Sequence, residues 1–507
     1  MARCTAYLIK HGVAARLTDL PVLEPEPFRQ CVIDNVNAGG RISALFGTPA
    51  QSGKVRLYAV IVHPSEGTIA LTATEVDEKY RSITPDCPQA HWFEREIAEQ
   101  WGVVPEGHPW LKPIRFHRSY RPGHDAFGRK DGSGILPSVT DFFRVEGEEV
   151  HEVAVGPVHA GIIEPGHFRF QCHGEHVFNL EISLGYQHRG VERALMGGPN
   201  KRTIHLMETL SGDTTVGHAT AYCQAVESLS GCKVPPRANA VRAVALELER
   251  LANHTGDLGA LAGDIGYQPT MSFCGRIRGD FLNMTAMLCG NRFGRGLVRP
   301  GGVGFDADGT VPGDMAGRMD AAFRDVEGAS ALLFDTPTVM ARFENTGVIS
   351  ATVCLSLGLV GPAARACGVG CDDRNNFPAG FYKTAALPVA TCDSGDVYAR
   401  ALVRRLEIQN SAAYVRKHIA ALPGGPINAE TGPLAPDSIA VSLVEAWRGE
   451  VCHVAITDKG GRFAHYKVVD PSFHNWAGLA MALRGQEISD FPLCNKSFNL
   501  SYCGHDL

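Results

Sequence analysis

The chain has 507 residues, of which 44% are hydrophobic and 20% are charged, and this is the composition of an ordinary globular protein. Because single hydrophobic cores rarely grow beyond about 250–300 residues, the length predicts two or three domains. A net charge of −6 and the lack of a basic run argue against a nucleic-acid-binding protein.

The fifteen cysteines are irregularly spaced in a long chain, which indicates buried thiols in a reducing compartment rather than an extracellular disulfide set. The start, MARCTAYLIKHG, has too short an apolar stretch for a signal peptide. No run reaches the ~18 uncharged apolar residues of a membrane span. We therefore expect any membrane association to come through partner subunits.

Residues 1–118 predict a small α/β domain. Residues 55–62 and 67–73 are rich in β-branched residues and end in polar turns, which indicates strands, and a helix is expected at 90–100. Residues 119–150 are expected to be a linker, because glycine and proline crowd the first part.

Residues 151–507 predict a larger α+β domain that is mainly helical. It opens with strand-like segments, including 167–170. Apolar residues at three- and four-residue spacing predict helices at 200–230, 237–261, 314–333 and 396–422. A hairpin is expected from 438–445 and 451–455.

The segment Glu94-Arg95-Glu96, followed by a Gly-His-Pro motif at 107–109, resembles the 30 kDa subunit of respiratory complex I. Without that resemblance, the three charged residues indicate a solvated helix face. The resemblance implies that the segment is mainly a docking surface for neighbouring subunits.

Residues 156–507 are similar to the complex I 49 kDa subunit and, more closely, to the large subunit of membrane-bound energy-converting [NiFe] hydrogenases such as formate hydrogenlyase and hydrogenase-4. The resemblance rests on ordered blocks: Gly156-Pro157-Val158-His159, Glu164-Pro165-Gly166-His167-Phe168-Arg169, Gln187-His188-Arg189-Gly190-Val191-Glu192, Arg250-Leu251-Ala252-Asn253-His254, Gly361-Pro362 and Pro471-Ser472-Phe473-His474-Asn475-Trp476. A fused 30 kDa-like and 49 kDa-like pair is itself a trait of that hydrogenase group. The implied fold is therefore that of a hydrogenase large subunit behind the α/β domain.

Two segments, 208–214 and 490–507, look like the metal-binding ends of such a large subunit. In that family two C-x-x-C pairs supply four thiolates, which suit a soft Ni–Fe centre. Those positions fall here on Ser211, Thr214, Ser501 and Gly504, and the sequence contains no C-x-x-C. The resemblance implies a subunit without a Ni–Fe centre; a true hydrogenase with unconventional ligands is the rival interpretation. Its candidate ligands are Cys494, Cys503 and His505.

Two charged residues match catalytic positions of the family. Glu164 matches a glutamate that relays protons in hydrogenases, and a partly dry cleft would raise its pKa toward working pH. A turn carboxylate that accepts backbone hydrogen bonds is an equally weighted alternative. Arg448 matches an arginine that overhangs the active cleft, and Trp447 replaces the usual proline before it, which is expected to loosen the turn. Without a metal, Glu164 and Arg448 are expected to pair with each other or with a ligand.

Asp264 matches an aspartate of the complex I quinone pocket. In that family it acts with a histidine and a tyrosine; the tyrosine position falls on Gly212, and the histidine position falls on Glu164, with His159 and His167 as neighbours. The quinone site is thus only partly present, and a helix-end aspartate that caps or pairs is the alternative.

The block containing His188, Arg189 and Glu192 is expected on one helix face, bracing an iron–sulfur partner against the cleft, with a buried ion pair as the alternative. His218 follows the first metal-binding segment and is expected to be a core histidine rather than a ligand, because the companion thiolates are missing.

Taken with the resemblance, these residues predict a subunit of a membrane-associated, complex I-like or energy-converting hydrogenase-related oxidoreductase. It would be peripheral, on the cytoplasmic side of a bacterial inner membrane. The implied partners are a small iron–sulfur subunit of the complex I 20 kDa type carrying [4Fe-4S], and membrane antiporter-like and anchor subunits. The chain itself is expected to hold no cofactor, with quinone binding left open. A quinone-reducing NADH dehydrogenase-type subunit and a redox-inactive scaffold remain alternatives.

Overall fold

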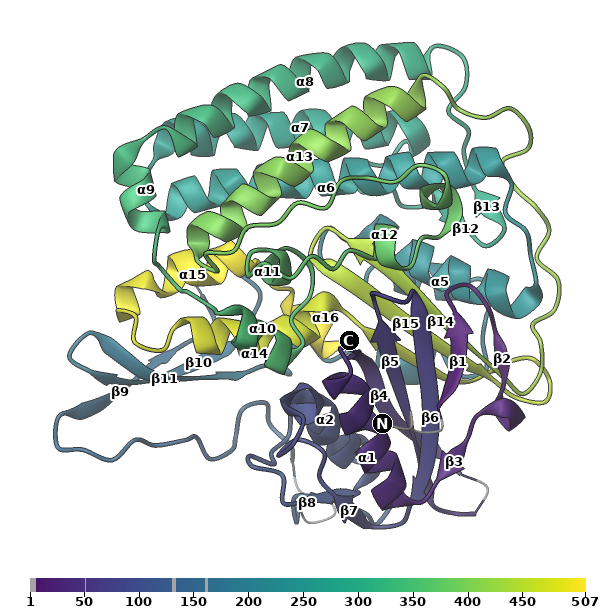
Figure 1. The fold of residues 1–507 in the computed structure, drawn as a ribbon, viewed down its shortest axis with the longest axis vertical. Helices are drawn as coiled ribbons and strands as arrows, with labels where there is room; N and C mark the ends of the chain where they lie inside the picture. Colours follow the sequence, from purple (N-terminus) through teal and green to yellow (C-terminus); the bar gives the residue numbers. More distant parts are fainter. Residues whose placement is uncertain (1–5, 51, 130–133, 160–162) are drawn as a thin grey trace.

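The structure, a computed structural model, describes residues 6–50, 52–129, 134–159 and 163–507. The N-terminal part is a five-stranded sheet with the order β1-β6-β5-β4, in which β3 pairs with β6. Two helices pack on it, and both expected strands and the expected helix are present (Figure 1). The elements are β1 (Tyr7–Lys10), β3 (Val22–Leu23), α1 (Pro25–Asn37), β4 (Arg41–Pro49), β5 (Val55–His63), β6 (Thr68–Val76) and α2 (His91–Trp101).

A second sheet near the end of the chain includes a strand from its beginning. The expected hairpin is present as β14 (Ser438–Ala446) and β15 (Gly449–Thr457), followed by β16 (Phe463–Val469). β2 (Ala15–Arg16) pairs antiparallel with β14, so the sheet order is β16-β15-β14-β2. Beside this strand, Nε2 of His11 accepts a hydrogen bond from the backbone N–H of Leu443 at 3.0 Å.

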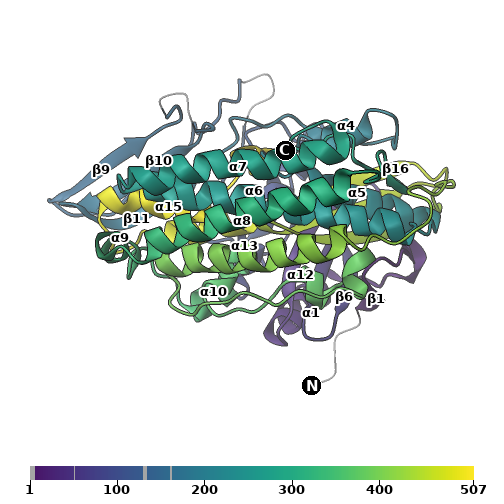
Figure 2. The same ribbon diagram turned by 90° about the horizontal axis from the view of Figure 1, so that it is seen from above.

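Four long helices form a layer over the second sheet (Figures 1 and 2). They are α6 (Pro236–Asp264), α7 (Gln268–Cys289), α8 (Val311–Phe334) and α13 (Val397–Ile419). Helices α6, α8 and α13 confirm those expected at 237–261, 314–333 and 396–422, whereas α7 was not predicted. The helix expected at 200–230 is broken into α4 (Thr203–Met207) and α5 (Thr215–Ser230). At the break Asp213 adopts a left-handed backbone (φ 53°), which interrupts the helix.

A third sheet, of order β11-β10-β9, extends to one side of the molecule in Figure 1. Its strands are β9 (Val150–Val155), β10 (His167–His173) and β11 (His176–Ser183). Beside it lie the C-terminal helices α14 (Pro471–Ala482), α15 (Phe491–Phe498) and α16 (Tyr502–Asp506). The shorter elements are β7 (Lys79–Arg81), β8 (Val104–Glu106), α3 (Val191–Ala194), β12 (Val298–Arg299), β13 (Gly302–Val303), α9 (Pro337–Phe343), α10 (Ala351–Leu357), α11 (Gly361–Arg365) and α12 (Asp373–Asn376).

The described parts of the proposed linker, 119–129 and 134–149, contain neither helix nor strand. They nevertheless lie against structured parts of the chain: Nζ of Lys112 bonds to the carbonyl of Asp141, and the hydroxyls of Ser138 and Ser183 are 2.8 Å apart. Among the helices in the described ranges, none combines the length and apolar character that crossing a membrane requires.

The charged segment of α2 is buried, which corrects the expectation of a solvated or partner-docking helix face. Glu94 is fully buried and accepts hydrogen bonds from the backbone N–H groups of Ile83 (2.8 Å) and Thr84 (3.0 Å). Arg95 donates through Nε to the carbonyl of Lys112 at 2.8 Å. These side chains therefore fix loops of their own domain, because each satisfies backbone groups that the fold removes from water.

Glu96 links the N-terminal part to the second sheet. Its carboxylate accepts from Nζ of Lys467 on β16 at 2.6 and 2.7 Å and also pairs with Arg115. Arg115 in turn donates to the carbonyl of His505 in α16 at 2.8 and 3.0 Å. All three charged side chains are about 1% exposed. The surface expected to meet other subunits is thus turned, in this chain, toward its own second half.

Candidate functional site

Arg448 joins the two segments that were predicted to correspond to metal-binding ends, 208–214 and 490–507. It lies in the two-residue turn between β14 and β15. Its Nε donates to the carbonyl of Asn499 at 2.6 Å, and its Nη1 donates to the carbonyl of Gly212 at 2.8 Å and to Oγ1 of Thr214 at 3.2 Å. Ser211 Oγ lies 3.4 Å from the same nitrogen. A guanidinium group therefore bridges loop 208–214 and the C-terminal segment.

Trp447 anchors the turn that carries Arg448 to loop 208–214. Its ring is buried, and Nε1 donates to the carbonyl of Asp213 at 2.9 Å and to Oγ1 of Thr214 at 3.1 Å. The guanidinium carbon of Arg448 lies 3.9 Å from the centre of the Trp447 rings, which is a cation–π contact. The expectation that tryptophan loosens the turn is therefore wrong, because the indole anchors both the turn and the facing loop.

Gly361 packs against the other side of the turn. Its backbone is left-handed (φ +65°), and a Cβ atom at this position would lie 2.2 Å from the carbonyl oxygen of Arg448 and 2.4 Å from Cα of Gly449. Only glycine permits this approach. The Gly361-Pro362 block found in the sequence therefore serves to seat the turn that carries Arg448.

Glu164 lies half-buried beside the C-terminal helix α16. Its Oε2 accepts the backbone N–H of Tyr502 at 2.9 Å. Burial and the Glu164 carboxylate raise the pKa of the neighbouring Cys503 thiol to about 11, so the thiol stays protonated at neutral pH. Within the described ranges Glu164 and Arg448 form no ion pair with each other, and their expected pairing with a ligand stays a prediction. Each is instead bound to the backbone of the C-terminal segment.

Asp470 fills the space beside Gly504. A Cβ atom on Gly504 would lie 2.6 Å from the carboxyl carbon of Asp470. Ser501 is also committed, because its Oγ accepts the N–H of Gly504 at 2.9 Å as the cap of α16. Two of the four predicted ligand positions, Ser501 and Gly504, thus make contacts that a metal-bound thiolate could not share.

His218 stands in a buried row of polar side chains behind Asp470. Its Nε2 lies 3.0 Å from Oδ2 of Asp470, and its Nδ1 lies 3.0 Å from Nε2 of His453. Nδ1 of His453 is 2.9 Å from the hydroxyl of Tyr466. Burial raises the pKa of Asp470, but the His218 hydrogen bond and the charges of His218 and Arg448 outweigh it and hold the pKa at about 2. Both ring nitrogens of His218 are therefore occupied by protein partners.

Comparison with known proteins identifies the family. Residues 40–131 match the profile of the respiratory-chain NADH dehydrogenase 30 kDa subunit, and residues 264–438 match that of the 49 kDa subunit. The chain is 31% identical to the carbon monoxide-induced hydrogenase of Rhodospirillum rubrum over 69% of this chain and 97% of the relative. It belongs to the complex I and membrane-bound hydrogenase family. It is also 30% identical to formate hydrogenlyase subunit 5 of Escherichia coli over 92% of this chain and 84% of the relative.

A solved structure agrees with the fold of this family. The membrane-bound sulfane sulfur reductase, an archaeal respiratory membrane complex, contains a chain that superposes with a TM-score of 0.67 at 23% identity, over 71% of this chain and 99% of the other. The fused 30 kDa-like and 49 kDa-like organisation and the hydrogenase large-subunit-like fold are thus confirmed. The chain is an oxidoreductase subunit of the complex I and hydrogenase type.

The residues present do not fit the Ni–Fe centre that membership of the hydrogenase branch implies. Of the three alternative ligands, Cys494 lies against Gly347, and His505 Nδ1 pairs with Asp506 at 2.9 Å. Cys503 instead approaches Oγ of Ser501 at 3.4 Å. These side chains face different surroundings. In the part of the chain that the structure describes, no group of three or more histidine, cysteine or acidic residues could hold a metal ion.

Of the positions predicted to form a quinone pocket, Gly212 and Glu164 both contact Cys503, whereas Asp264 stands apart from them. Asp264 is exposed and is the last residue of α6. It lies eleven residues beyond Asn253, which bonds to the loop beside the exposed Gly212, so it stands roughly 16 Å farther along the helix axis. Nε2 of His159 lies 2.9 Å from the carbonyl oxygen of Gly166, seven residues along the chain. His167 also has a local partner, because its Nε2 accepts a hydrogen bond from Nε of Arg169 at 3.1 Å.

The block containing His188 and Glu192 does not form one helix face, which corrects that expectation. Only α3, which begins at Val191, is helical, because Gly190 is left-handed (φ +66°). His188 lies in the preceding loop, where its Nδ1 is 2.8 Å from the carbonyl of Asp506. Glu192 pairs with Lys467 at 2.9 Å, in agreement with the buried-ion-pair alternative.

Sequence reasoning missed the roles of Asp470 and Trp447. Asp470 directly precedes the Pro471 block, and its position before a helix-starting proline is a signal for a capping aspartate. Nothing in the sequence indicates that it also meets Gly504. The change from proline to tryptophan at 447 was visible, but the partners of the indole come from residues more than 230 positions away.

Proposed function

We propose that this chain forms, with a small iron–sulfur subunit of the complex I 20 kDa type, an electron- and proton-transfer cleft that works without a Ni–Fe centre. The partner would carry [4Fe-4S] clusters, and antiporter-like and anchor subunits would hold the complex at the cytoplasmic side of the membrane. The boundaries 1–118, 119–150 and 151–507 are part of this proposal. Family membership supports the oxidoreductase class. The contacts of Ser501 and Gly504 support the absence of a Ni–Fe centre.

The observation that carries the proposal is the contact between Asp470 and Gly504. A cysteine at 504 would need the buried Asp470 to move, and Asp470 is bound to His218 and caps α14 through the N–H of Ser472 at 2.8 Å. Hydroxyl groups at Ser211 and Thr214 are poor ligands for a soft metal. In place of a metal, the Arg448 guanidinium links the same two segments.

We expect the purified complex to contain less than about a tenth of an equivalent of nickel, because the thiolate ligands that nickel binding requires are missing. The measurement is elemental analysis of complex isolated from cells grown with added nickel. As a matched control, a variant with cysteine at 211, 214, 501 and 504 should also remain nickel-free, since Asp470 still occupies the space at 504. Stoichiometric nickel in the natural chain would establish the rival interpretation, a hydrogenase with unconventional ligands.

Glu164 is proposed as the proton-handling residue of the cleft. The proposal is supported by its position, because the side chain is half-buried between solvent and the Cys503 and Tyr502 groups of the C-terminal segment. We expect Glu164→Gln to lower turnover of the assembled complex by roughly 100-fold or more, because the amide keeps the hydrogen bond to Tyr502 but cannot titrate. Turnover is measured as reoxidation of the reduced partner cluster.

The matched control for this prediction is Glu152→Gln, which changes a largely exposed carboxylate in the adjacent sheet and should leave turnover unchanged. Undiminished electron transfer in Glu164→Gln would reject the relay and favour the scaffold alternative. Loss of assembly would instead show that the carboxylate serves only the 164–166 turn.

A further inference from the structure

A polar stripe runs along one face of α6 in the middle of the protein. Arg250, Asn253, His254 and Asp257 follow the spacing i, i+3, i+4, i+7, which places them on the same side of a helix. Each is no more than 6% exposed. Four polar residues in a row at this depth require a reason, because burying charge costs free energy even when it is paired.

Two members of the stripe support the turn that carries Arg448. Arg250 donates through Nη2 to the carbonyl of Glu445 at 2.7 Å and through Nη1 to the carbonyl of Ala446 at 3.1 Å. The imidazole of His254 meets Trp447 edge-on, with ring centres 6.3 Å apart and planes at 82°. The residues immediately before Arg448 are thus fixed by α6.

The other two members support the segments that receive the Arg448 hydrogen bonds. Asn253 donates through Nδ2 to the carbonyl of Asp213 at 3.1 Å, beside Gly212 and Thr214. Asp257 accepts from Nδ2 of Asn499 at 2.5 Å, and the carbonyl of Asn499 is the acceptor for Nε of Arg448. One helix face therefore reaches all three backbone segments around the guanidinium group.

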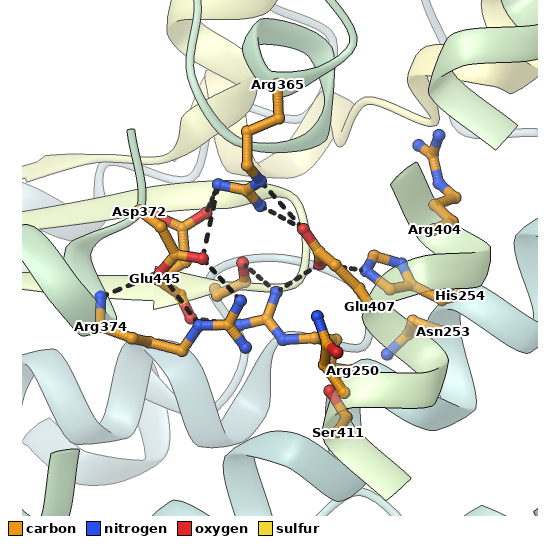
Figure 3. A network of polar contacts seen from close by, with 12 residues as sticks. Arg250, Asn253, His254, Arg365, Asp372, Arg374, Arg404, Glu407, Ser411 and Glu445 are labelled. Atoms are coloured by element: carbon orange, nitrogen blue, oxygen red, sulfur yellow. Dashed lines mark hydrogen bonds and ion pairs between the residues drawn. The ribbon is translucent and has the colours of Figure 1, made fainter. Parts of the chain in front are cut away.

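Side chains of helix α13 pair with residues of the stripe on α6 (Figure 3). Arg404 donates through Nε to Asp257 at 2.7 Å, and Glu407 pairs with His254 at 2.7 Å and with Arg250 at 3.2 Å. Glu407 also binds Arg365 of α11 at 2.6 Å. Arg250, His254 and Asp257 of the stripe are thereby paired with α13 as well as with the segments around Arg448.

We propose that Arg250, Asn253, His254 and Asp257 are positioning residues that hold the Arg448 guanidinium in the cleft. The proposal rests on the cleft role of Arg448 given under the proposed function. Besides the Trp447 ring and the hydroxyls of Ser211 and Thr214, its partners are the backbone carbonyls of Gly212 and Asn499, so fixing those carbonyls restrains its orientation. Arginine loses rotamer entropy when its side chain is ordered, and a rigid set of acceptors reduces that loss per hydrogen bond.

Chemical modification tests this directly. Phenylglyoxal reacts with accessible guanidinium groups, and peptide mass spectrometry of the full chain in its complex reports the rate at Arg448. We expect Asp257→Asn and Asn253→Ala each to raise that rate about fivefold or more, because each releases a segment that restrains the side chain. The uncharged Asn253→Ala change keeps the test valid if Asp257→Asn folds poorly.

The matched control is Glu227→Gln. This residue forms an equally buried pair with Arg242 at 2.6 Å and supports the loop at Gly301 instead of the cleft. It should lower the melting temperature by a similar amount and leave the Arg448 modification rate within about 1.5-fold of the natural chain. An unchanged rate in both stripe variants, or an equal rise in the control, would overturn the proposal.

A double-mutant cycle supplies a second readout. Arg448→Lys keeps the charge but loses the planar fork. If Asp257 acts through Arg448, Asp257→Asn lowers turnover severalfold in the natural background and less than about twofold in the Arg448→Lys background. Independent, multiplying effects would reject the link. If the cleft proves to have no turnover, the modification experiment still decides the positioning role, so the two proposals fail separately.

Discussion

Replacing Glu96 with glutamine is expected to lower the free energy of unfolding by about 3–5 kcal/mol, because the change leaves buried cations without their counter-charge. Glu96 is the anion between Arg115 and Lys467, and all three side chains are about 1% exposed. Lys467 retains Glu192 at 2.9 Å, whereas Arg115, among the described residues, keeps the carbonyl of His505 as its hydrogen-bond acceptor. The loss of stability should therefore weaken the contact between the two halves of the chain.

The measurement is thermal melting combined with limited proteolysis, since a chain of this size need not unfold in a single step. The variant should melt earlier and be cleaved faster within 119–150. Glu106→Gln is the matched control: its pair with Lys79, at 2.8 Å, is on the surface of the same domain, and surface pairs are screened by water. Equal melting temperatures of the Glu96 and Glu106 variants would show that the contact between the two halves of the chain does not depend on the Glu96 charge.

Gly361→Ala is expected to cost about 3 kcal/mol or more and to displace the turn that carries Trp447 and Arg448. Two effects add: alanine is disfavoured at φ +65°, and its Cβ would overlap the carbonyl oxygen of Arg448 at 2.2 Å. Because the turn cannot retreat without losing the Trp447 contacts, stability and cleft geometry should fail together. Melting temperature and the Arg448 modification rate measure the two consequences.

Gly290→Ala separates the backbone effect from the overlap. Gly290 has a similar backbone (φ +73°), but a Cβ atom there meets nothing within 4 Å. This variant should show only the smaller cost of a left-handed alanine and no change at Arg448. If both glycine variants behave alike, the close approach of Gly361 to the turn has no energetic weight.

Periodicity and family blocks in the sequence predicted most of the fold. The long helices α6, α8 and α13 and the β14–β15 hairpin were predicted correctly, because each has an uninterrupted pattern of apolar residues. The helix expected at 200–230 failed because apolar spacing continues across loop 208–214, while the left-handed backbone of Asp213 interrupts the helix. A local pattern cannot show a break that tertiary contacts impose.

The candidate site was less predictable because its chemistry depends on long-range contacts. Glu94 and Glu96 are charged, and the sequence therefore favours a surface position for both. The backbone groups and cations that pair with their buried carboxylates are visible only in the folded chain. Trp447 was expected to loosen its turn because its partners, Asp213 and Thr214, are unrelated to it in sequence. The resemblance located the segments, whereas the interactions between them required coordinates.

The pairing of β2 with β14 has a consequence for how such a protein is made. Residues 15 and 16 are synthesised more than 400 residues before their strand partners, Ser438 and Ile439. The early segment must therefore wait, unpaired, for most of translation. Once the pairing forms, fusion keeps both strands at a high effective concentration that two separate polypeptides would reach only by binding each other. Joining the two halves in one chain thus makes this docking independent of expression level.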